Sequence, residues 1–417
     1  MTASKPYDIL VLGAGGFTGQ LVSRYLASQA VSQNFKLAVG GRNGEKIERR
    51  MKEVGVTADV LVADAEDERS LREVIKQVKV VVSLVGPYMQ HGELIYKCCA
   101  ELGVHHCDLS GETPFVYNMI QKYTRSALAS KAILVNAAGY DSIPSDLCTF
   151  LAVQRLKKVG GDSTKAGRVR SGFRAKGGIS GGTFASLIGL VEAGKEDQQV
   201  TLNPYALSPI EGKHKPSPVL AGSFTFRGER TWGSFFVMAP FNTAIVRRSW
   251  GIFESADPSS RVLSYGPNFN YDEYFILPGP ISSFLVSVAL YLSFASLFLS
   301  PIRWLTKKFG PKSGDGPSKK AQESGWFETV CVAKSDDGKY ETKVTMKGKG
   351  DPGYSATSAM ISECALSLLK DHDRLPPIAK HGGPLTPATA LGNVLVERLE
   401  KTGRFSFTVE DEETKSK

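Results

Sequence analysis

A glycine-rich turn close to the first residues constrains this chain more than any other feature. The apolar run 9–12 is followed by glycines at positions 13, 15, 16 and 19, and apolar residues at helical spacing begin at Leu21. A buried strand, such a turn and a helix start form a cradle for the diphosphate of a dinucleotide, because glycines let the backbone approach and a helix N-terminus offers free N–H groups. We expect cofactor contacts at Gly13, Gly15, Gly16, Phe17, Thr18 and Gly19.

The spacing of these glycines is not the common one. It is Gly13-x-x-Gly16-x-x-Gly19 rather than G-x-G-x-x-G, since position 18 is threonine. The alternative is a glycine-rich strand-to-helix turn that binds nothing. The position of the turn, after an apolar strand and before a helix, favours the cofactor site over that alternative.

The next predicted strand, 35–40, indicates which dinucleotide binds. NAD enzymes usually place Asp or Glu about 20 residues after the glycines, where it holds the ribose 2′-hydroxyl. This chain has Gly41 and Arg42 there, and a guanidinium attracts a 2′-phosphate that a carboxylate would repel. The sequence therefore predicts NADP(H), unless Arg42 is only a solvated cation at a helix start. Asp64, which follows a third short strand at 59–63, is expected near the adenine.

Strands and helices alternate over residues 1–146. Apolar runs at 78–85 and 132–138 are separated by helical patterns at 93–102 and 114–130, which is typical of a doubly wound, Rossmann-type parallel sheet. Ligands of such sheets bind beyond the carboxyl ends of the strands. The turns 86–91, 108–112 and 139–146 should therefore face the nicotinamide, with Val85, Gly86 and Pro87 against the cofactor.

The proton donor for a hydride-transfer reaction is expected in the same turns. The candidates are Tyr88, His91, Tyr140 and Asp141, and we predict Tyr88 and Asp141 as the catalytic residues. Asp141 could instead cap the 142–146 turn. No tyrosine has a lysine four residues later, which excludes the Tyr-x-x-x-Lys mechanism of short-chain dehydrogenases.

Several short motifs occur in a fixed order along most of the chain. They are Gly-Phe-Thr-Gly at 16–19, Gly-Arg-Asn at 41–43, Val-Gly-Pro-Tyr at 85–88, Asp-Leu-Ser-Gly-Glu at 108–112, Asp-Ser-Ile-Pro-Ser-Asp at 141–146, Ser-Gly-Gly-Thr at 180–183 and Gly-Asp-Pro-Gly-Tyr at 350–354. Together they resemble the saccharopine dehydrogenase-like oxidoreductases, in the branch that includes the mycobacterial trans-acting enoyl reductases. The resemblance covers about residues 7–369 and departs from the family at Gly15, where relatives usually carry Thr or Ser. It does not imply that saccharopine is the substrate.

The composition is that of a globular enzyme with two domains. The chain has 417 residues, 42% hydrophobic and 22% charged, with a formal net charge of +9. No basic–aromatic stripe accompanies that charge, so we expect no nucleic acid partner. The six cysteines and six histidines show no metal-ligand spacing, and we expect no metal and reduced, buried thiols, with Cys107 a core residue. The first residues lack an apolar signal segment, so the nucleotide-binding half should lie in the cytosol.

A second informative segment lies at 281–299. Its nineteen residues carry no charge, and a helix of that length spans about 28 Å, close to the hydrocarbon core of a bilayer. Prolines bracket it, and a basic stretch follows from Arg303 to Lys320. A single crossing would separate residues 325–417 from the rest of the fold, so we expect a re-entrant or interface-embedded helix. The alternative is a buried core helix. Relatives found on lipid droplets would fit a segment embedded in a monolayer.

The expected fold is therefore α/β, with a Rossmann-type sheet, a second α+β substrate domain and a hydrophobic membrane-associating segment. The expected domains are 1–146 for the cofactor, 147–350 for the substrate, which contains the segment 278–308, and 351–417, a helical region packing back on the core with a disordered tail at 409–417. In the middle region Arg168, Arg170, Arg174 and Lys176 alternate along a strand, and either hold an anionic substrate or form a solvated face.

The sequence predicts an NADP(H)-dependent oxidoreductase that reduces a C=C, C=O or C=N bond. The apolar segment indicates a lipid-like substrate at a membrane or lipid-droplet surface. Two alternatives remain: a sensor that binds NADP(H) without turnover, and a structural lipid-droplet protein with a vestigial nucleotide fold. A second copy of the chain, forming a homodimer, is a further possible partner that the sequence does not decide.

Overall fold

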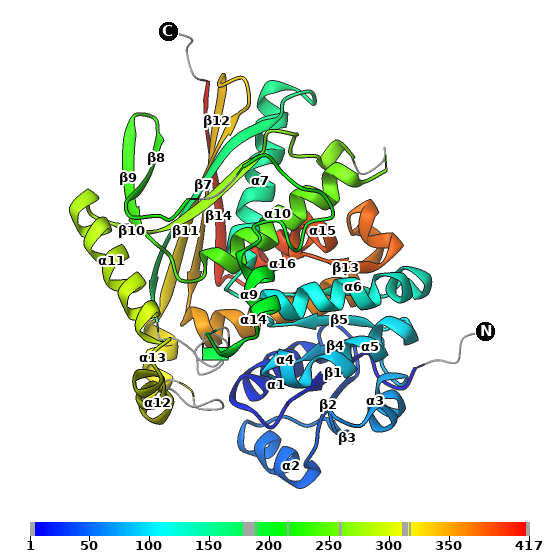
Figure 1. The fold of residues 1–417 in the computed structure, drawn as a ribbon. Helices are drawn as coiled ribbons and strands as arrows, with labels where there is room; N and C mark the ends of the chain where they lie inside the picture. Colours follow the sequence, from blue (N-terminus) through cyan, green and yellow to red (C-terminus); the bar gives the residue numbers. More distant parts are fainter. Residues whose placement is uncertain are drawn as a thin grey trace.

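Two seven-stranded sheets make up the fold, which we describe from a computed structural model (Figure 1). The description covers residues 5–177, 188–189, 191–214, 217–257, 261–310, 316 and 318–413. The motif at 180–183 lies outside them. The cofactor half surrounds the first sheet, sheet A, and the second sheet, sheet B, stands above it in Figure 1.

Sheet A is parallel throughout, as the alternating pattern predicts. In spatial order its strands are β13 (Gly383–Leu385), β6 (Ile133–Val135), β5 (His105–Asp108), β4 (Val80–Ser83), β1 (Ile9–Leu12), β2 (Leu37–Gly41) and β3 (Asp59–Val62). Side chains of β1 alternate between two cores, with Ile9 and Val11 in one and Leu10 and Leu12 in the other. This sheet is covered on both faces, which explains the unbroken apolar runs of its central strands.

Helices cover both faces of sheet A. One face carries α1 (Phe17–Ala30), α2 (Gly44–Glu53) and α14 (Thr357–Lys370), and the other carries α3 (Glu68–Ile75), α5 (Glu93–Leu102) and α6 (Thr113–Ser130), with the short α4 (Tyr88–His91) before α5. The helical patterns expected at 93–102 and 114–130 correspond to α5 and α6. Pro352–Ala356 forms a single π-helical turn, η2, ahead of α14.

Sheet B is mixed, and its face away from α7 and α10 is only partly open, because Phe226, Tyr274 and Val332 are buried together there. Its order is β14 (Phe405–Glu413), β12 (Tyr340–Lys349), β11 (Trp326–Ser335), β7 (Ala166–Lys176), β10 (Asn270–Leu277), β9 (Glu229–Ser234) and β8 (Gly222–Phe226), and only β7 and β10 pair in parallel. Its inner face packs on α7 (Ile143–Gly160) and α10 (Ala239–Ser255). Phe327 and Cys331 point inward and are buried, whereas Trp326 and Lys347 are exposed on what we call the outer face.

The carboxyl-terminal region does not form a separate helical unit. After α14 the chain adds β13 to sheet A, then α15 (Pro387–Ala390) and α16 (Gly392–Lys401), and finally adds β14 to sheet B. The prediction of disorder from residue 409 was wrong for residues 409–413, because this acidic segment pairs with the basic strand β12, where Lys343 lies across from Glu410. One hydrophobic core runs from β1 through α14 and α7 to β11 and β14.

The uncharged segment forms two helices instead of one. These are α11 (Pro280–Ser296) and α12 (Ser300–Phe309), and they meet at an angle of 100°. The ring of Pro301 would collide with the carbonyl of the residue four positions earlier, so a straight helix cannot pass Leu297. Within the described residues no single helix is long and apolar enough to cross a bilayer, although this bent pair passes the same length and composition test jointly.

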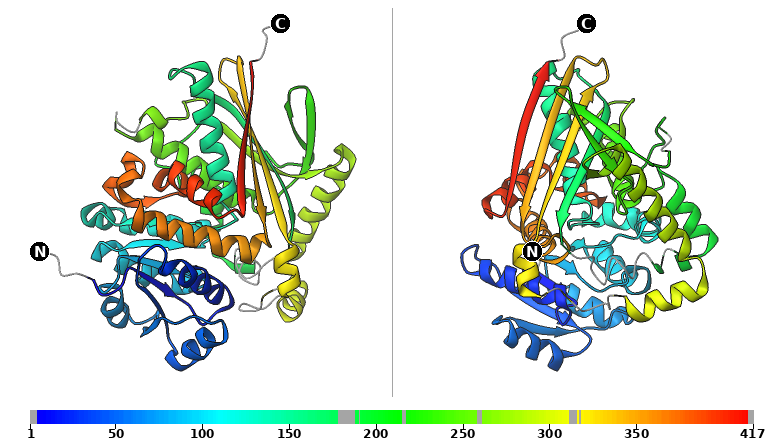
Figure 2. Two further views of the ribbon diagram at one scale, coloured as in Figure 1. Left: turned by 180° about the vertical axis from the view of Figure 1, so that it is seen from behind. Right: turned by 90° about the vertical axis from the view of Figure 1, so that its left-hand side faces the viewer.

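The bent pair is also not a buried core element. Large apolar side chains of both helices are exposed: Ile281, Phe284, Leu285, Leu292, Phe298, Leu299, Trp304, Leu305 and Phe309. We call these nine side chains the α11–α12 patch. In α11 the buried residues are Ser283 and Ser287. Both views of Figure 2 show the pair projecting from the body of the molecule beside sheet B.

Candidate functional site

The glycine turn and the start of α1 form a cradle of backbone N–H groups. Gly13 has φ +87°, and its amide donates to the carbonyl of Gly40 at 2.9 Å, so the turn is tied to β2. The helix cap, Gly16, offers no side chain to the first amides of α1, and the first turn contains no acidic residue. Within the described residues no side chain caps these amides, so they are available to an anion at the positive end of the helix dipole.

Two of the glycines are required by close backbone contacts. A Cβ on Gly19 would lie 2.2 Å from the carbonyl oxygen of Gly13, and one on Gly13 would lie 2.8 Å from that of Leu84. A Cβ on Gly15 would meet only a side-chain carbon of Ile47, at 3.5 Å. Glycine is therefore essential at 13 and 19 and dispensable at 15. The backbone approach that a diphosphate needs is present.

Arg42 stands directly after β2, the strand next to the cradle. It is exposed, and no described carboxylate lies within ion-pair distance of it. The next residue, Asn43, caps α2 by accepting a hydrogen bond from the amide of Lys46 at 2.9 Å. Arg42 therefore precedes α2 with an exposed guanidinium, which can bind a 2′-phosphate in bidentate fashion. Asp64 follows β3, and its carboxylate accepts from the amide of Glu66, which leaves one oxygen for a ligand.

Val85, Gly86 and Pro87 follow β4 at the same edge, and Val85 lies near the position that a Cβ of Gly13 would take. The next residue, Tyr88, is buried, and its hydroxyl is used twice by the backbone. It donates to the carbonyl of Ser83 at 2.9 Å and accepts from the amide of Leu109 at 3.0 Å. Burial raises the pKa of Tyr88 well above its usual range. These contacts assign Tyr88 to joining β4 and β5, and we do not carry it into the chemistry below.

Asp141 lies in the turn between β6 and α7. Its carboxylate oxygen is 4.0 Å from where a Cβ of Gly111 would stand, so two of the predicted turns meet there. It accepts no hydrogen bond from any described residue, and burial raises its pKa to about 6. Its neighbour Tyr140 packs on Phe327 of β11, with ring centroids 4.8 Å apart. Asp141 is thus the candidate proton donor that lies where the two sheets meet.

The buried carboxylate of Asp108 joins the same turns. It accepts from the amides of Ser110 and Ala137 and from the side chains of Ser110 and Asn136. The motif at 108–112 is therefore a structural connection that fixes the turn facing Asp141.

Sequence reasoning missed one buried acid on β10. Glu273 accepts hydrogen bonds from Ser145, Tyr271 and Asn242, at 2.9, 2.8 and 2.9 Å. Asn242 in turn accepts from Ser142, the residue after Asp141, at 3.1 Å. Burial raises the pKa of Glu273 to about 7, although its three hydrogen bonds lower it. The sequence signal for this residue was that Glu273 is the one acid among alternating residues that are otherwise Tyr271, Phe275 and Leu277.

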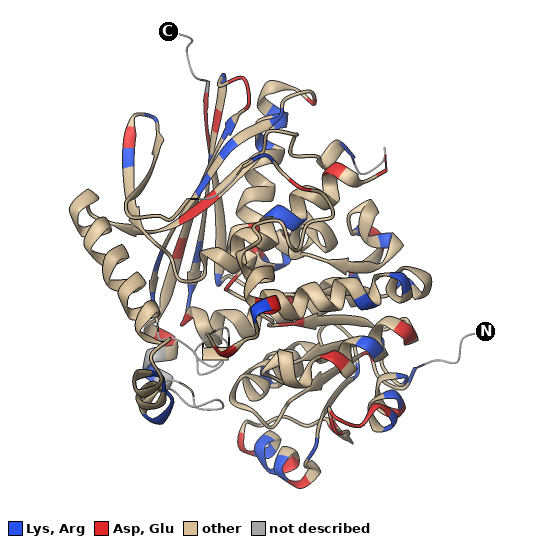
Figure 3. Cartoon of the chain, in the orientation of Figure 1, with Lys and Arg blue, Asp and Glu red and all other residues tan. Residues whose placement is uncertain are grey.

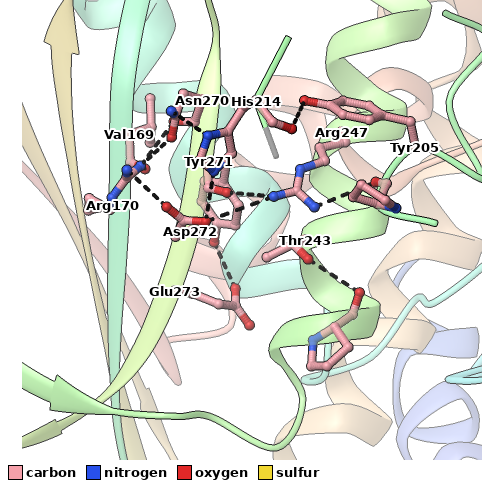
Figure 4. A network of polar contacts seen from close by, with 12 residues as sticks. Val169, Arg170, Tyr205, His214, Thr243, Arg247, Asn270, Tyr271, Asp272 and Glu273 are labelled. Carbon is pink, nitrogen blue, oxygen red and sulfur yellow. Dashed lines mark hydrogen bonds and ion pairs between the residues drawn. The ribbon is translucent and has the colours of Figure 1, made fainter. Parts of the chain in front are cut away.

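The other acid at this point of β10, Asp272, holds a structural ion-pair network (Figure 4). Arg170 pairs with it at 2.9 Å and also donates to Asn270, and His214 contacts it at 3.2 Å. Since β9 pairs with β10 only at Phe275–Leu277, the carbonyl of Tyr271 lies on an open edge, and Arg247 satisfies it at 3.0 Å.

This network corrects the expectation that the alternating basic residues of β7 share one role, either in binding an anionic substrate or on a solvated face. Arg170 is buried and paired, whereas Arg168, Arg174 and Lys176 are exposed. All six cysteines are free thiols and buried, and burial raises the pKa of Cys107 well above its usual range, which confirms it as a core residue.

A parallel sheet, a glycine cradle and Arg42 beside it define an NADP-binding oxidoreductase of the Rossmann class. Residues 9–135 match the family described as saccharopine dehydrogenase NADP binding domain. A candidate trans-acting enoyl reductase of Mycobacterium tuberculosis (strain ATCC 25618 / H37Rv) is 34% identical over 97% of this chain and 98% of its own length. The trans-acting enoyl reductase of Mycobacterium ulcerans (strain Agy99) is 30% identical over 96% and 97%.

The chain belongs to the saccharopine dehydrogenase-like family that includes these trans-acting enoyl reductases. It is an NADP(H)-dependent oxidoreductase, as the sequence predicts. Among solved structures, the apo saccharopine dehydrogenase (L-Glu forming) of Saccharomyces cerevisiae aligns with a TM-score of 0.51, over 97% of this chain and 100% of that one. At 12% identity this likeness concerns the fold alone.

Proposed function

We propose that the protein reduces a C=C, C=O or C=N bond of a lipid-like substrate, and that it does so on the cytosolic face of a membrane or a lipid droplet. The observation that carries this proposal is the α11–α12 patch, an exposed apolar surface on the same chain as the NADP(H) cradle.

The residues around the cradle support reduction. NADPH supplies a hydride when bound, and the product then needs a proton. Asp141 is at the carboxyl edge of sheet A, where ligands of such sheets bind, and it has no hydrogen-bond partner among the described residues. With a pKa of about 6, part of its population is protonated near neutral pH. We infer that Asp141 delivers the proton, and that Glu273 and Asn242 hold the adjoining turn through Ser142.

The orientation of α11 supports contact with lipid. A surface helix of a soluble domain normally buries its apolar side and exposes its polar side. In α11 the arrangement is reversed: Ser287 accepts a hydrogen bond from the amide of Phe235 at 2.8 Å, Tyr291 stacks on Phe235, and the apolar residues face outward. Exposing that much apolar surface is unfavourable in water and favourable in a hydrocarbon layer.

The second helix supports an interfacial position. α12 carries Arg303, Lys307 and Lys308 beside Trp304 and Phe309, and Figure 3 shows its basic residues next to the uncharged α11. Glu192 offsets part of this charge through ion pairs with Arg303 and Lys307. A bent pair with an apolar side, a tryptophan and flanking cations matches the composition of helices that lie in the headgroup region.

Two measurements test the proposal together. The purified protein should co-float with phospholipid vesicles, and it should oxidise NADPH with α,β-unsaturated or carbonyl lipids presented in those vesicles, with Asp141→Asn as the inactive comparison. Turnover of water-soluble amino-acid adducts alone would contradict the lipid substrate. Cofactor binding without oxidation of NADPH across the panel would indicate the sensor, and flotation without measurable cofactor binding would indicate the structural coat protein.

A further inference from the structure

A pocket of about 400 Å³ opens on sheet B, at the end of the sheet where β11 begins. It is lined by Trp326, Phe327, Glu328, Lys347, Gly348, Lys349, Gly403, Arg404, Phe405 and Ser406. Trp326 and Lys347 belong to the outer face, whereas Phe327, which touches Tyr140, is on the inner face. The charged lining residues of β11 and β12 alternate with Phe327 and Gly348 along the strands, so they lie on the outer face with Trp326, on the other side of the sheet from Tyr140, the neighbour of Asp141.

The charge of this pocket is unbalanced. Three of its lining residues are cationic, and Glu328 is its one lining carboxylate. Glu328 is already shared between Lys347 at 3.4 Å and Arg174 at 3.8 Å. In the described part of the chain no carboxylate lies within ion-pair distance of Lys349 or Arg404.

The strand register adds a further cation and an aromatic ring. Trp326 is paired with Lys176 of β7 on one side and with Lys349 of β12 on the other. Its side chain is 43% exposed, although the ring would be more stable out of water. Tryptophan flanked by lysines is the combination that protein surfaces use at the boundary between water and lipid headgroups.

A second pocket of the same size does not have this excess of positive charge. It also measures about 400 Å³ and lies on the cofactor half, where Glu48 and Lys52 are its charged lining residues. One charge of each sign balances there, whereas the pocket on sheet B combines Lys347, Lys349 and Arg404 with Glu328 alone.

The position of the cationic pocket indicates its ligand. In the right-hand view of Figure 2 the strands of sheet B and the bent pair α11–α12 lie on the side of the molecule that is turned toward the viewer. α13 (Lys319–Ser324) leads from the region of α12 directly to Trp326. Resting on the membrane contact proposed above, we propose that this pocket binds the phosphate group of an anionic membrane lipid, held by Lys347, Lys349 and Arg404 and covered by Trp326.

The test uses a water-soluble short-chain lipid, so that it does not depend on membrane insertion. Calorimetry of the full chain with dihexanoylphosphatidic acid should give one saturable site. The double variant Lys347→Gln/Lys349→Gln should weaken it about 25-fold, because each basic residue near an anionic lipid surface contributes about fivefold. Lys52→Gln, which removes one lysine charge from the balanced pocket, should leave the affinity unchanged.

Vesicles then identify the source of the phosphate. Phosphatidic acid in phosphatidylcholine vesicles should strengthen flotation of the wild type and not of the double variant, while both still bind neutral vesicles through α11–α12. Absence of heat with dihexanoylphosphatidic acid, or equal affinity of the double variant, would overturn the proposal. Equally tight binding of inorganic phosphate, with flotation indifferent to phosphatidic acid, would also overturn it. Failure of every vesicle to bind would count against the proposed membrane contact and not against the pocket.

Discussion

Replacing part of the α11–α12 patch by serine should abolish binding to vesicles while preserving the fold. Ile281, Leu285 and Leu292 are suitable, because their exposed fractions are 76%, 60% and 66% and none of them belongs to the core. Fully burying such a side chain contributes about 1.5–3 kcal/mol, so roughly two-thirds burial in lipid gives about 1–2 kcal/mol each. The triple variant should therefore lose about 3–6 kcal/mol of binding free energy, which is at least about a 100-fold loss of partitioning.

Co-flotation with neutral phosphatidylcholine vesicles over a range of lipid concentrations measures this loss. The control is Val31→Ser/Leu202→Ser, since these residues are 93% and 81% exposed and lie outside the patch. Both variants should retain the thermal unfolding midpoint and the NADPH affinity of the wild type. Flotation of the triple variant equal to that of the wild type would show that the patch does not enter lipid, and an equal loss in the control would show that general surface hydrophobicity drives binding.

Three further predictions concern the cofactor site. Arg42→Asp should weaken NADPH binding about 10- to 150-fold, because it removes a charge-assisted contact of about 1.5–3 kcal/mol. Calorimetry should show that NADH binding is not weakened, and an equal loss for both cofactors would mean that the fold is damaged. Gly19→Ala should abolish NADPH binding and lower the unfolding midpoint, because its Cβ would stand 2.2 Å from the carbonyl oxygen of Gly13, whereas Gly15→Ala should change neither. Asp141→Asn should stabilise the protein at pH 8 and not at pH 4. Burial raises the pKa of Asp141 from 3.8 to about 6, so its favourable contribution is complete below pH 4 and is lost as the pH rises through 6. The resulting loss of folding free energy at pH 8 is at most about 3 kcal/mol, and it is smaller because solvent reaches this half-buried carboxyl. Urea unfolding at the two pH values measures the difference, and a variant that is stabilised at pH 4 and not at pH 8 would refute the prediction.

The cofactor cradle could be predicted from the sequence because its determinants are local. Gly13, Gly16 and Gly19 follow an apolar strand within a few residues, and Arg42 follows the next strand, so chain order alone places them at one edge. The same holds for α5 and α6, whose apolar spacing is strong.

Features that depend on distant partners could not be predicted. The part of β14 from residue 409 onward was expected to be disordered, because its acidic residues look solvated until the basic strand β12 is placed beside them. Arg170 differs from Arg168 and Arg174 only because β10 brings Asp272 to it. The environment of Glu273 is equally distant in sequence, since Ser145 and Asn242 come from α7 and α10.

The apolar segment was recognised, but its shape was not. Hydropathy reports the length of an uncharged run and does not report which side of a helix faces the protein. The structure shows that the inward side of α11 is marked by Ser283 and Ser287, and Ser287 accepts a hydrogen bond from the amide of Phe235.

The path of residues 383–413 has a consequence for how this protein is made. This stretch supplies an edge strand first to sheet A and then to sheet B, and it is synthesised after all the other strands. Neither half can therefore complete its hydrogen bonding while the ribosome is still translating the middle of the chain. We expect a single, late folding step for the whole molecule, and we expect the isolated fragment 1–146 to aggregate when expressed alone.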